Sequence, residues 1–159
     1  MEIERKWILK GFPEGLKEIK ELWMRQTYLN VNPEVRIRKK YEAANNSVDY
    51  KLSIKGDGDL SRIEVEKYID ESEYDSLMSM TNKKPISKTC KVYDLGYGLK
   101  LECSIVDEGT EDEFYYAEVE FKSEDLANSF ILPFDAVEVT NDKSYKMKNY
   151  WARTRLNVL

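Results

Sequence analysis

Charged and apolar residues alternate along six short segments of this chain, and the charged positions are almost entirely Glu, Lys and Arg. In the first segment, Glu2, Glu4 and Lys6 alternate with the apolar residues Ile3 and Trp7. The same alternation recurs at residues 35–38, 51–55, 62–69, 99–105 and 118–122. Because side chains two apart on a β-strand share a face, each segment is predicted to form a strand with one charged and one apolar face.

The rest of the chain also predicts mostly strands, with a few helices between them. Extended segments are predicted at residues 2–9, 22–30, 35–41, 48–55, 61–69, 86–93, 99–106, 114–122 and 136–139. Short helices are predicted to begin at Pro13, at a capping sequence from Ser72 and at Ser123, and a longer one to span about Asn141–Arg155. Strands dominate, so the predicted fold class is α+β with a mostly antiparallel sheet. The 159 residues contain no linker-like stretch, and a single domain over residues 1–159 is expected.

Amphipathic strands allow two interpretations of the charged faces. In the first, the sheet has one solvated face, as antiparallel sheets often do. In the second, the sheet closes into a barrel with its charged faces inward and helices covering the apolar outside. Like charges recur two residues apart at Glu2 and Glu4, Arg36 and Arg38, Glu64 and Glu66, and Glu118 and Glu120. Such neighbours repel unless a ligand of opposite sign lies between them, which speaks for the barrel, but the residues alone leave both interpretations open.

The carboxylate pairs and the basic residues together suit one kind of ligand. Carboxylate oxygens are the ligands that Mg²⁺ and Mn²⁺ prefer. Arginine makes forked contacts with phosphate groups, and lysine binds them as a point charge. A site with both sets would hold a polyphosphate together with a divalent metal ion.

Several classes of function are disfavoured by composition. The chain has no histidine, which excludes Ser–His and Cys–His catalysis and zinc sites with His ligands. Its net charge of -5 argues against nucleic acid as the main partner. No apolar run approaches the ~20 residues of a membrane span, so no membrane partner is expected. The charged residues after Met1 do not form a signal peptide, and Cys90 and Cys103 do not form a disulfide framework, so a cytoplasmic location is expected.

Five motifs resemble, in order, those of one known family. Glu2-x-Glu4-x-Lys6 is similar to the ExExK signature of the CYTH superfamily, the triphosphate tunnel metalloenzymes. The others are Arg36-x-Arg38, Lys51-Leu52-Ser53-Ile54-Lys55-Gly56, Arg62-x-Glu64-x-Glu66 and Ala117-Glu118-Val119-Glu120-Phe121, which resemble the RxR, KLTxKG, RxExE and AEVEF strands of that family. Cys90 departs from the pattern, because the family usually has a second basic residue two positions after the one matched by Lys88. Lys91 and Lys100 are the candidates to replace it.

The resemblance implies a closed antiparallel eight-stranded β-barrel that forms a tunnel, with flanking helices and a C-terminal helix. The catalytic residues that it implies are Glu2, Glu4, Lys6, Glu64, Glu66 and Glu118. The phosphate-binding residues that it implies are Lys6, Arg36, Arg38, Lys51, Lys55, Arg62 and Lys88. The principal metal ligands that it implies are Glu2, Glu4 and Glu120, for Mg²⁺ or Mn²⁺.

The activity that the resemblance favours is metal-dependent hydrolysis of inorganic triphosphate to pyrophosphate and phosphate, with nucleoside triphosphates as further candidate substrates. The chain is short and has no recognisable insertion for a base or a thiazolium ring, which favours the inorganic substrate. Three alternatives stay open: a class IV adenylate cyclase, a thiamine triphosphatase, and a polyphosphate- or nucleotide-binding module without catalysis. Members of the family are often dimers, so a homodimer is also expected.

Overall fold

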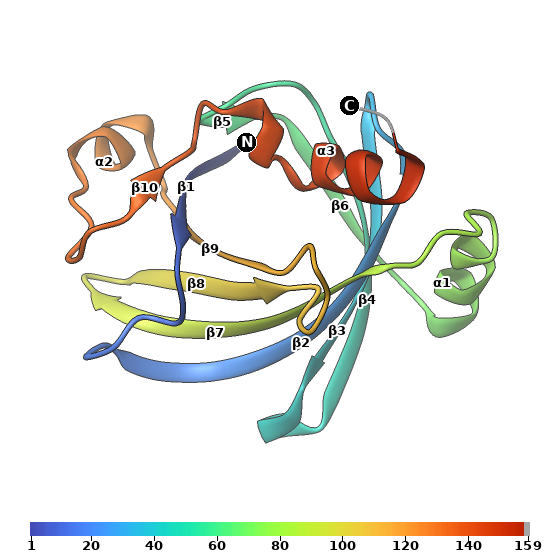
Figure 1. The fold of residues 1–159 in the computed structure, drawn as a ribbon, viewed down its shortest axis with the longest axis horizontal. Helices are drawn as coiled ribbons and strands as arrows, with labels where there is room; N and C mark the ends of the chain where they lie inside the picture. The colour runs from blue at the N-terminus through green and yellow to red at the C-terminus, as the bar shows by residue number, and fades with distance from the viewer. Residues whose placement is uncertain (158–159) are drawn as a thin grey trace.

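One antiparallel sheet forms most of the molecule and curls into a nearly closed barrel (Figure 1). The computed structural model describes residues 1–157, so the last two residues of the predicted domain, 158 and 159, lie outside the described part. The strands are β1 (Glu2–Leu9), β2 (Lys17–Asn30), β3 (Glu34–Glu42), β4 (Ser47–Lys55), β5 (Ser61–Arg62), β6 (Glu64–Ile69), β7 (Ile86–Gly96), β8 (Leu99–Val106), β9 (Phe114–Glu120) and β10 (Val137–Glu138). Their hydrogen-bonded order is β10-β1-β9-β8-β7-β2-β3-β4-β6. The predicted antiparallel sheet is therefore confirmed.

The barrel is nearly closed because one predicted strand is divided into two strands that pair with different partners. The segment expected at residues 61–69 divides at Ile63 into β5 and β6. β6 pairs with β4, whereas β5 pairs with β1 on the other side of the opening. The prediction of eight strands is wrong: among residues 1–157, nine strands follow the hydrogen-bonded path. The additional strand is the short β10, which pairs with Trp7 and Ile8 of β1. The short β5 pairs only with Glu2 and Ile3 within the described residues, so β10 provides hydrogen-bond partners for the backbone at the other end of β1.

Two of the predicted helix starts differ from the structure. No helix follows Pro13, because Gly15 has a positive φ of 79° and the chain enters β2 at Lys17. Helix α1 (Glu71–Met78) begins after Asp70 rather than Ser72. The Asp70 side chain accepts a hydrogen bond from the Glu73 amide, and the Glu73 carboxylate accepts one from the Asp70 amide. A capping box is therefore present, two residues earlier than expected.

The other two helical predictions are confirmed in whole or in part. Helix α2 (Glu124–Ser129) begins at Ser123, whose hydroxyl accepts a hydrogen bond from the Leu126 amide. The predicted C-terminal helix is broken into a 3₁₀ turn η2 (Lys143–Tyr145), helix α3 (Met147–Trp151) and a π-helical turn η3 (Ala152–Leu156). A further 3₁₀ turn, η1 (Ala43–Asn45), connects β3 and β4. No helix within residues 1–157 is long and apolar enough to cross a membrane.

Apolar residues pack mainly on the outside of the barrel and at one of its ends. The outer face of β1, β7, β8 and β9 packs against α2 through a cluster of buried side chains, which are Trp7, Tyr93, Leu101, Cys103, Ala117, Val119, Phe121 and Ala127. Helix α1 covers β4, where the rings of Tyr74 and Tyr50 lie 5.1 Å apart. At one end of the barrel, α3 packs through Met147 and Trp151 onto Tyr28 and Tyr116. The sheet turns its charged face inward, around the cavity, and much of its apolar face is covered, so the solvated-sheet interpretation is wrong.

Candidate active site

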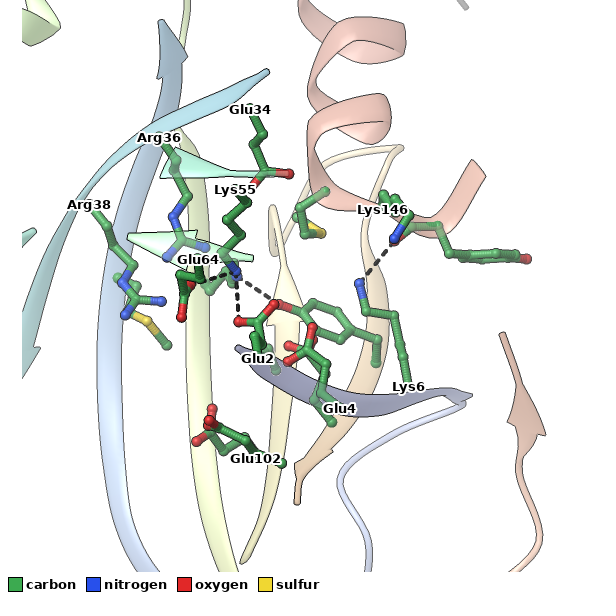
Figure 2. Close-up of a pocket in the computed structure, with 18 of the residues that line it drawn as sticks. Glu2, Glu4, Lys6, Glu34, Arg36, Arg38, Lys55, Glu64, Glu102 and Lys146 are labelled. Carbon is green, nitrogen blue, oxygen red and sulfur yellow. Dashed lines mark hydrogen bonds and ion pairs between the residues drawn. The ribbon is translucent and has the colours of Figure 1, made fainter. Parts of the chain in front are cut away.

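The barrel encloses a cavity of about 330 Å³ whose lining is dominated by charged side chains (Figure 2). The lining includes every residue predicted for the site: Glu2, Glu4, Lys6, Arg36, Arg38, Lys51, Lys55, Arg62, Glu64, Glu66, Lys88, Glu118 and Glu120. The structure therefore brings the whole predicted set together. The role of each residue stays a prediction.

Strand register explains why residues far apart in sequence meet in this cavity. On β1 and β9, Lys6 lies opposite Glu118 and Glu4 lies opposite Glu120. On β3 and β4, Arg38 lies opposite Lys51. Residues directly opposite in an antiparallel pair share a face of the sheet, so the charged positions of one strand face those of the next around the barrel.

Within residues 1–157, one part of the lining presents cations that have no carboxylate at ion-pair distance. Arg36 donates a hydrogen bond to the Ser53 hydroxyl at 3.4 Å, and Lys88 donates one to the Tyr116 hydroxyl at 2.6 Å. Among residues 1–157, no carboxylate lies within ion-pair distance of Arg36, Arg38 or Lys88. Burial and the nearby Arg36 guanidinium lower the pKa of Lys88 to about 7. Buried cations without carboxylate partners form an anion-binding surface.

A second part of the lining carries excess negative charge. Burial, Glu118 and Glu2 raise the pKa of Glu4 well above its usual value. Burial would also raise the pKa of Glu118, but Lys6 and a hydrogen bond from Glu4 lower it to about 2. The Glu4 and Glu118 carboxyl groups therefore lie close enough to interact, and their surroundings shift their pKa values in opposite directions. Burial and Glu2 raise the pKa of Glu120 as well, so these carboxylates crowd each other.

The predicted metal ligands fit a divalent cation by chemistry, although they do not form a preformed cage. Within the described residues, no three acidic or sulfur ligands converge in the arrangement of a metal site. A divalent cation beside these crowded carboxylates would nevertheless relieve the repulsion between them. Oxygen donors of this kind suit Mg²⁺ and Mn²⁺. Glu4 and Glu120 lie opposite each other in the register, and Glu2, two residues before Glu4 on β1, completes the predicted set that would hold the ion, with Glu118 nearby.

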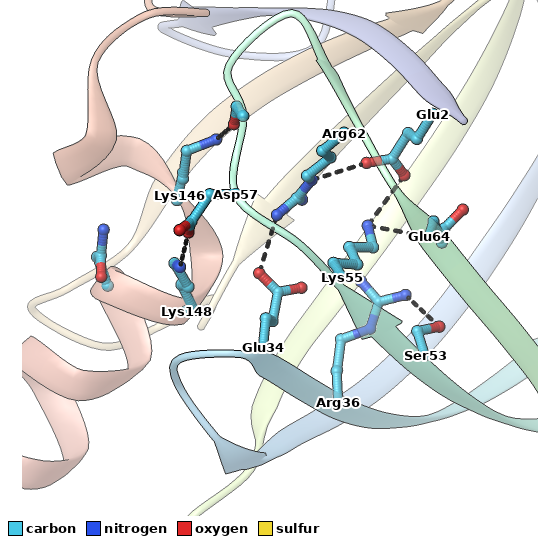
Figure 3. Close-up of polar contacts among 12 residues, drawn as sticks. Glu2, Glu34, Arg36, Ser53, Lys55, Asp57, Arg62, Glu64, Lys146 and Lys148 are labelled. Carbon is cyan, nitrogen blue, oxygen red and sulfur yellow. Dashed lines mark hydrogen bonds and ion pairs between the residues drawn. The ribbon is translucent and has the colours of Figure 1, made fainter.

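Other basic residues of the predicted set are already paired with carboxylates (Figure 3). The Lys55 Nζ lies 2.9 Å from the Glu2 Oε2 and 3.2 Å from the Glu64 Oε2. The Arg62 Nε lies 3.1 Å from the Glu2 Oε1, and its Nη1 lies 3.1 Å from the Glu34 Oε1. Lys51 and Glu66 form a further pair at 3.1 Å. The lumen therefore contains both free and neutralised cations.

The lining also contains functional candidates that the sequence analysis did not identify. Glu34 is buried and lies two residues before Arg36, so the strand alternation could have identified it. Lys146 lies between η2 and α3, where no periodic pattern points to the lumen, and its Nζ donates to the Gly58 carbonyl at 2.6 Å. Glu102 and Tyr116 are further members of the lining.

The position that departs from the family pattern belongs to an apolar part of the wall. Cys90 is 1% exposed and packs with Leu22, Met24 and Val92 on β2 and β7. Burial raises the pKa of the Cys90 thiol to about 11, so it is protonated and fills space. Of the two candidates to replace the expected basic residue, Lys100 lines the cavity.

Comparisons with known proteins find relatives over nearly the whole chain, although no protein-family model matches it. The chain is 35% identical over 151 residues to an inorganic triphosphatase from Nitrosomonas europaea, which covers 92% of this chain and 94% of that protein. The crystal structure of an inorganic triphosphatase matches with a TM-score of 0.63 and 30% identity, covering 94% of this chain and 93% of the other. A putative adenylyl cyclase from Hippeastrum with a dominant triphosphatase activity shares the fold, with a TM-score of 0.57 and 18% identity over 80% of this chain and 83% of the other.

A nearly closed antiparallel barrel with opposed acidic and basic side chains in its lumen defines a class of tunnel proteins suited to polyanions. The Nitrosomonas relative extends this likeness along almost all of the sequence. The chain belongs to the CYTH superfamily, the triphosphate tunnel metalloenzymes. The resemblance drawn from the five motifs is thus confirmed.

Proposed function

We propose that this protein hydrolyses inorganic triphosphate to pyrophosphate and phosphate with the help of Mg²⁺ or Mn²⁺. The observation that carries the proposal is the pairing, inside one cavity, of buried cations without counter-charge and crowded carboxylates. A triphosphate supplies the missing negative charge, and a divalent ion supplies the missing positive charge. The similarity to an inorganic triphosphatase over most of the chain supports the same substrate.

The first contacts to the substrate come from the cations that have no protein counter-ion. Arg36, Arg38 and Lys88 line adjacent parts of the cavity, and Lys6 reaches it from β1. Binding a phosphate chain there removes the repulsion between Arg36 and Lys88, so part of the binding energy comes from relief of unfavourable charge. Lys51 and Lys55 join this set when the incoming phosphates compete for them with Glu66 and Glu64.

The carboxylates divide between holding the metal ion and orienting water. Glu2, Glu4 and Glu120 would hold the ion, with Glu118 nearby, and the bound ion would neutralise charge on the phosphate oxygens. Glu64 and Glu66 are the carboxylates left to orient the attacking water. In the reaction, water oxygen bonds to a terminal phosphorus, the bond from that phosphorus to the bridging oxygen breaks, and pyrophosphate leaves.

The test is phosphate release from inorganic triphosphate with Mg²⁺, with Mn²⁺ and with a chelator, with ATP in parallel. Rapid release from triphosphate that stops in chelator is expected. Cyclic AMP formed from ATP would replace the proposal with a cyclase. Binding of triphosphate without release of phosphate under any condition would replace it with a binding module.

We also propose that the protein acts in the cytoplasm and as a homodimer. Both cysteines are free and buried, as suits a reducing compartment. On the outer face, Ile54 and Val65 lie opposite each other on β4 and β6 and are 42% and 61% exposed, with Ile63 beside them. An exposed apolar patch of this kind suits a subunit contact. Light scattering after size exclusion gives the mass in solution, and Val65→Glu should shift a dimer to the monomer.

A further inference from the structure

Arg62 differs from the other arginines of the lumen because it is held between two carboxylates (Figure 3). Its Nε lies 3.1 Å from the Glu2 Oε1, and its Nη1 lies 3.1 Å from the Glu34 Oε1. The three residues come from β5, β1 and β3, so they connect strands across the place where the barrel closes. Glu2 is 9% exposed and Glu34 is 3% exposed. The guanidinium is therefore enclosed by its two partners.

Because Glu34 is buried, moving Arg62 away from it is unfavourable. Over the described residues, Arg62 is the only cation within ion-pair distance of Glu34. Moving Arg62 onto a phosphate would leave a buried carboxylate without a counter-charge, which is strongly unfavourable. No such penalty applies to Arg36 or Arg38, which have no carboxylate at ion-pair distance within residues 1–157. The lumen thus contains arginines without a carboxylate partner and one that is anchored by two carboxylates.

The way Arg62 meets Glu2 indicates what it does instead. A guanidinium has donors in a rigid planar fork, so contacts on two sides fix its orientation. Lys55 also contacts Glu2, but through a single ammonium group on a flexible stem, and it can turn to another partner. With Glu34 on one side and Glu2 on the other, Arg62 determines where the Glu2 carboxylate lies in the cavity.

We propose that Glu34 is a positioning residue that holds Arg62 against Glu2, and that Arg62 orients this carboxylate and does not bind phosphate. The inference rests on the proposed function, since Glu2 is part of the predicted catalytic set. It changes the role of Arg62, which the family resemblance placed among the phosphate ligands. It also gives Glu34, which neither the motifs nor the resemblance singled out, a part in the reaction.

The first experiment measures triphosphate affinity by calorimetry in the presence of chelator. The variant is the double substitution Glu34→Gln with Arg62→Gln, which keeps the net charge of the lumen and leaves no buried charge unpaired. Its affinity is expected to stay within about twofold of the wild type. Arg36→Gln, measured alongside, should lower the affinity for triphosphate by about tenfold or more, because the anion loses a charged hydrogen-bond donor. A loss in the double variant as large as that of Arg36→Gln would make Arg62 a phosphate ligand and overturn the proposal, whatever the turnover.

The second experiment measures kcat and KM for triphosphate. Glu34→Gln is expected to lower kcat by about 10- to 100-fold, the usual effect of losing a residue that orients a catalytic ligand, with little change in KM. Glu34→Asp, which keeps the charge, should recover part of the loss. The matched control is Asp107→Asn, because Asp107 is a 4% exposed carboxylate that pairs with Arg155 outside this cavity. The control should lose stability and keep kcat.

The outcomes separate the two proposals. Wild-type turnover combined with an unchanged kcat in Glu34→Gln would overturn the positioning role alone. An equal fall in kcat for Asp107→Asn would show that Glu34 acts only through stability. Absence of wild-type turnover would overturn the proposed function, and the affinity measurement would still decide whether Arg62 binds phosphate.

Discussion

The two faces of strand β1 carry the same kinds of charge with opposite consequences. On the outer face, Arg5 donates to both carboxylate oxygens of Glu138 at 2.8 and 2.7 Å, and to the carbonyls of Ala127 and Phe130 at 2.7 and 2.8 Å. On the inner face, burial and the neighbouring Glu118 and Glu2 raise the pKa of Glu4. The Arg5 charge on the outer face is satisfied by the protein, whereas several charges of the lumen have no ion-pair partner within residues 1–157. Incomplete pairing, more than charge itself, is what marks the functional surface.

The largest expected effect comes from removing an inner charge at the predicted metal position. Glu120→Gln should lower kcat by at least about 100-fold, because a ligand of the ion is lost while the side chain keeps its shape. The melting temperature should hold or rise, since a crowded carboxylate is removed. Turnover of triphosphate and thermal melting of the same preparation check both statements. Unchanged turnover would exclude Glu120 from the site.

On the outer face of β1, removing a charge is expected to lower stability and to leave catalysis unchanged. Arg5→Met should reduce the free energy of unfolding by about 2 kcal/mol, because the α2 carbonyls and the half-exposed Glu138 lose their donor. The values of kcat and KM should change little. Urea unfolding, together with steady-state kinetics at a temperature where the variant is folded, gives the two numbers. A loss of kcat in the folded variant would show that the two faces are not independent.

A satisfied buried charge away from the lumen should affect pH dependence and not catalysis. Burial would raise the pKa of Asp107, but hydrogen bonds from Arg155 and Tyr150 hold it below its usual value. A lowered folded-state pKa contributes stability above the unfolded value of about 3.9, and this is lost as pH falls through the folded value.

Asp107→Asn should therefore be less stable than the wild type at neutral pH, with a difference that shrinks as the pH falls below about 4. Urea unfolding at several pH values between 3 and 7 measures this difference. A difference that is constant over this range would mean that the Asp107 charge contributes nothing to stability.

The smallest expected effect is a pH dependence of triphosphate binding that comes from Lys88 in the lumen. Lys88 has a pKa of about 7 in the free barrel, and a bound triphosphate should raise it. Binding at pH 8 is then coupled to proton uptake, and affinity should fall by at most about tenfold per pH unit above 7. Calorimetry with chelator, in buffers of different ionisation enthalpy, counts the protons. The Lys88→Met variant should take up fewer protons on binding than the wild type. Equal proton uptake by the two proteins would mean that groups other than Lys88 take up the protons.

Much of the fold and of the site could be predicted from local sequence patterns. The alternation of charged and apolar residues placed β1 and β8 at the residues that the structure shows, and it identified the side chains that share the lumen. The helix expected after Pro13 failed because strand pairing extends β2 to Lys17. The break at Ile63 was missed because it depends on β5 and β6 having different partners, which no local pattern encodes.

The sequence by itself determined which residues face inward, because the direction of a side chain alternates with each residue of a strand and needs no knowledge of the neighbouring strands. Only the tertiary structure decided which charges neutralise each other. Arg36 and Arg62 look alike in sequence, since each lies two residues before another charged residue, Arg38 and Glu64 respectively. Closure of the barrel brings Arg62 between Glu2 and Glu34, whereas within residues 1–157 the Arg36 side chain hydrogen-bonds only to the Ser53 hydroxyl. Electrostatic partners are set by distances across strands that are far apart in the chain, and those distances exist only once the sheet has closed.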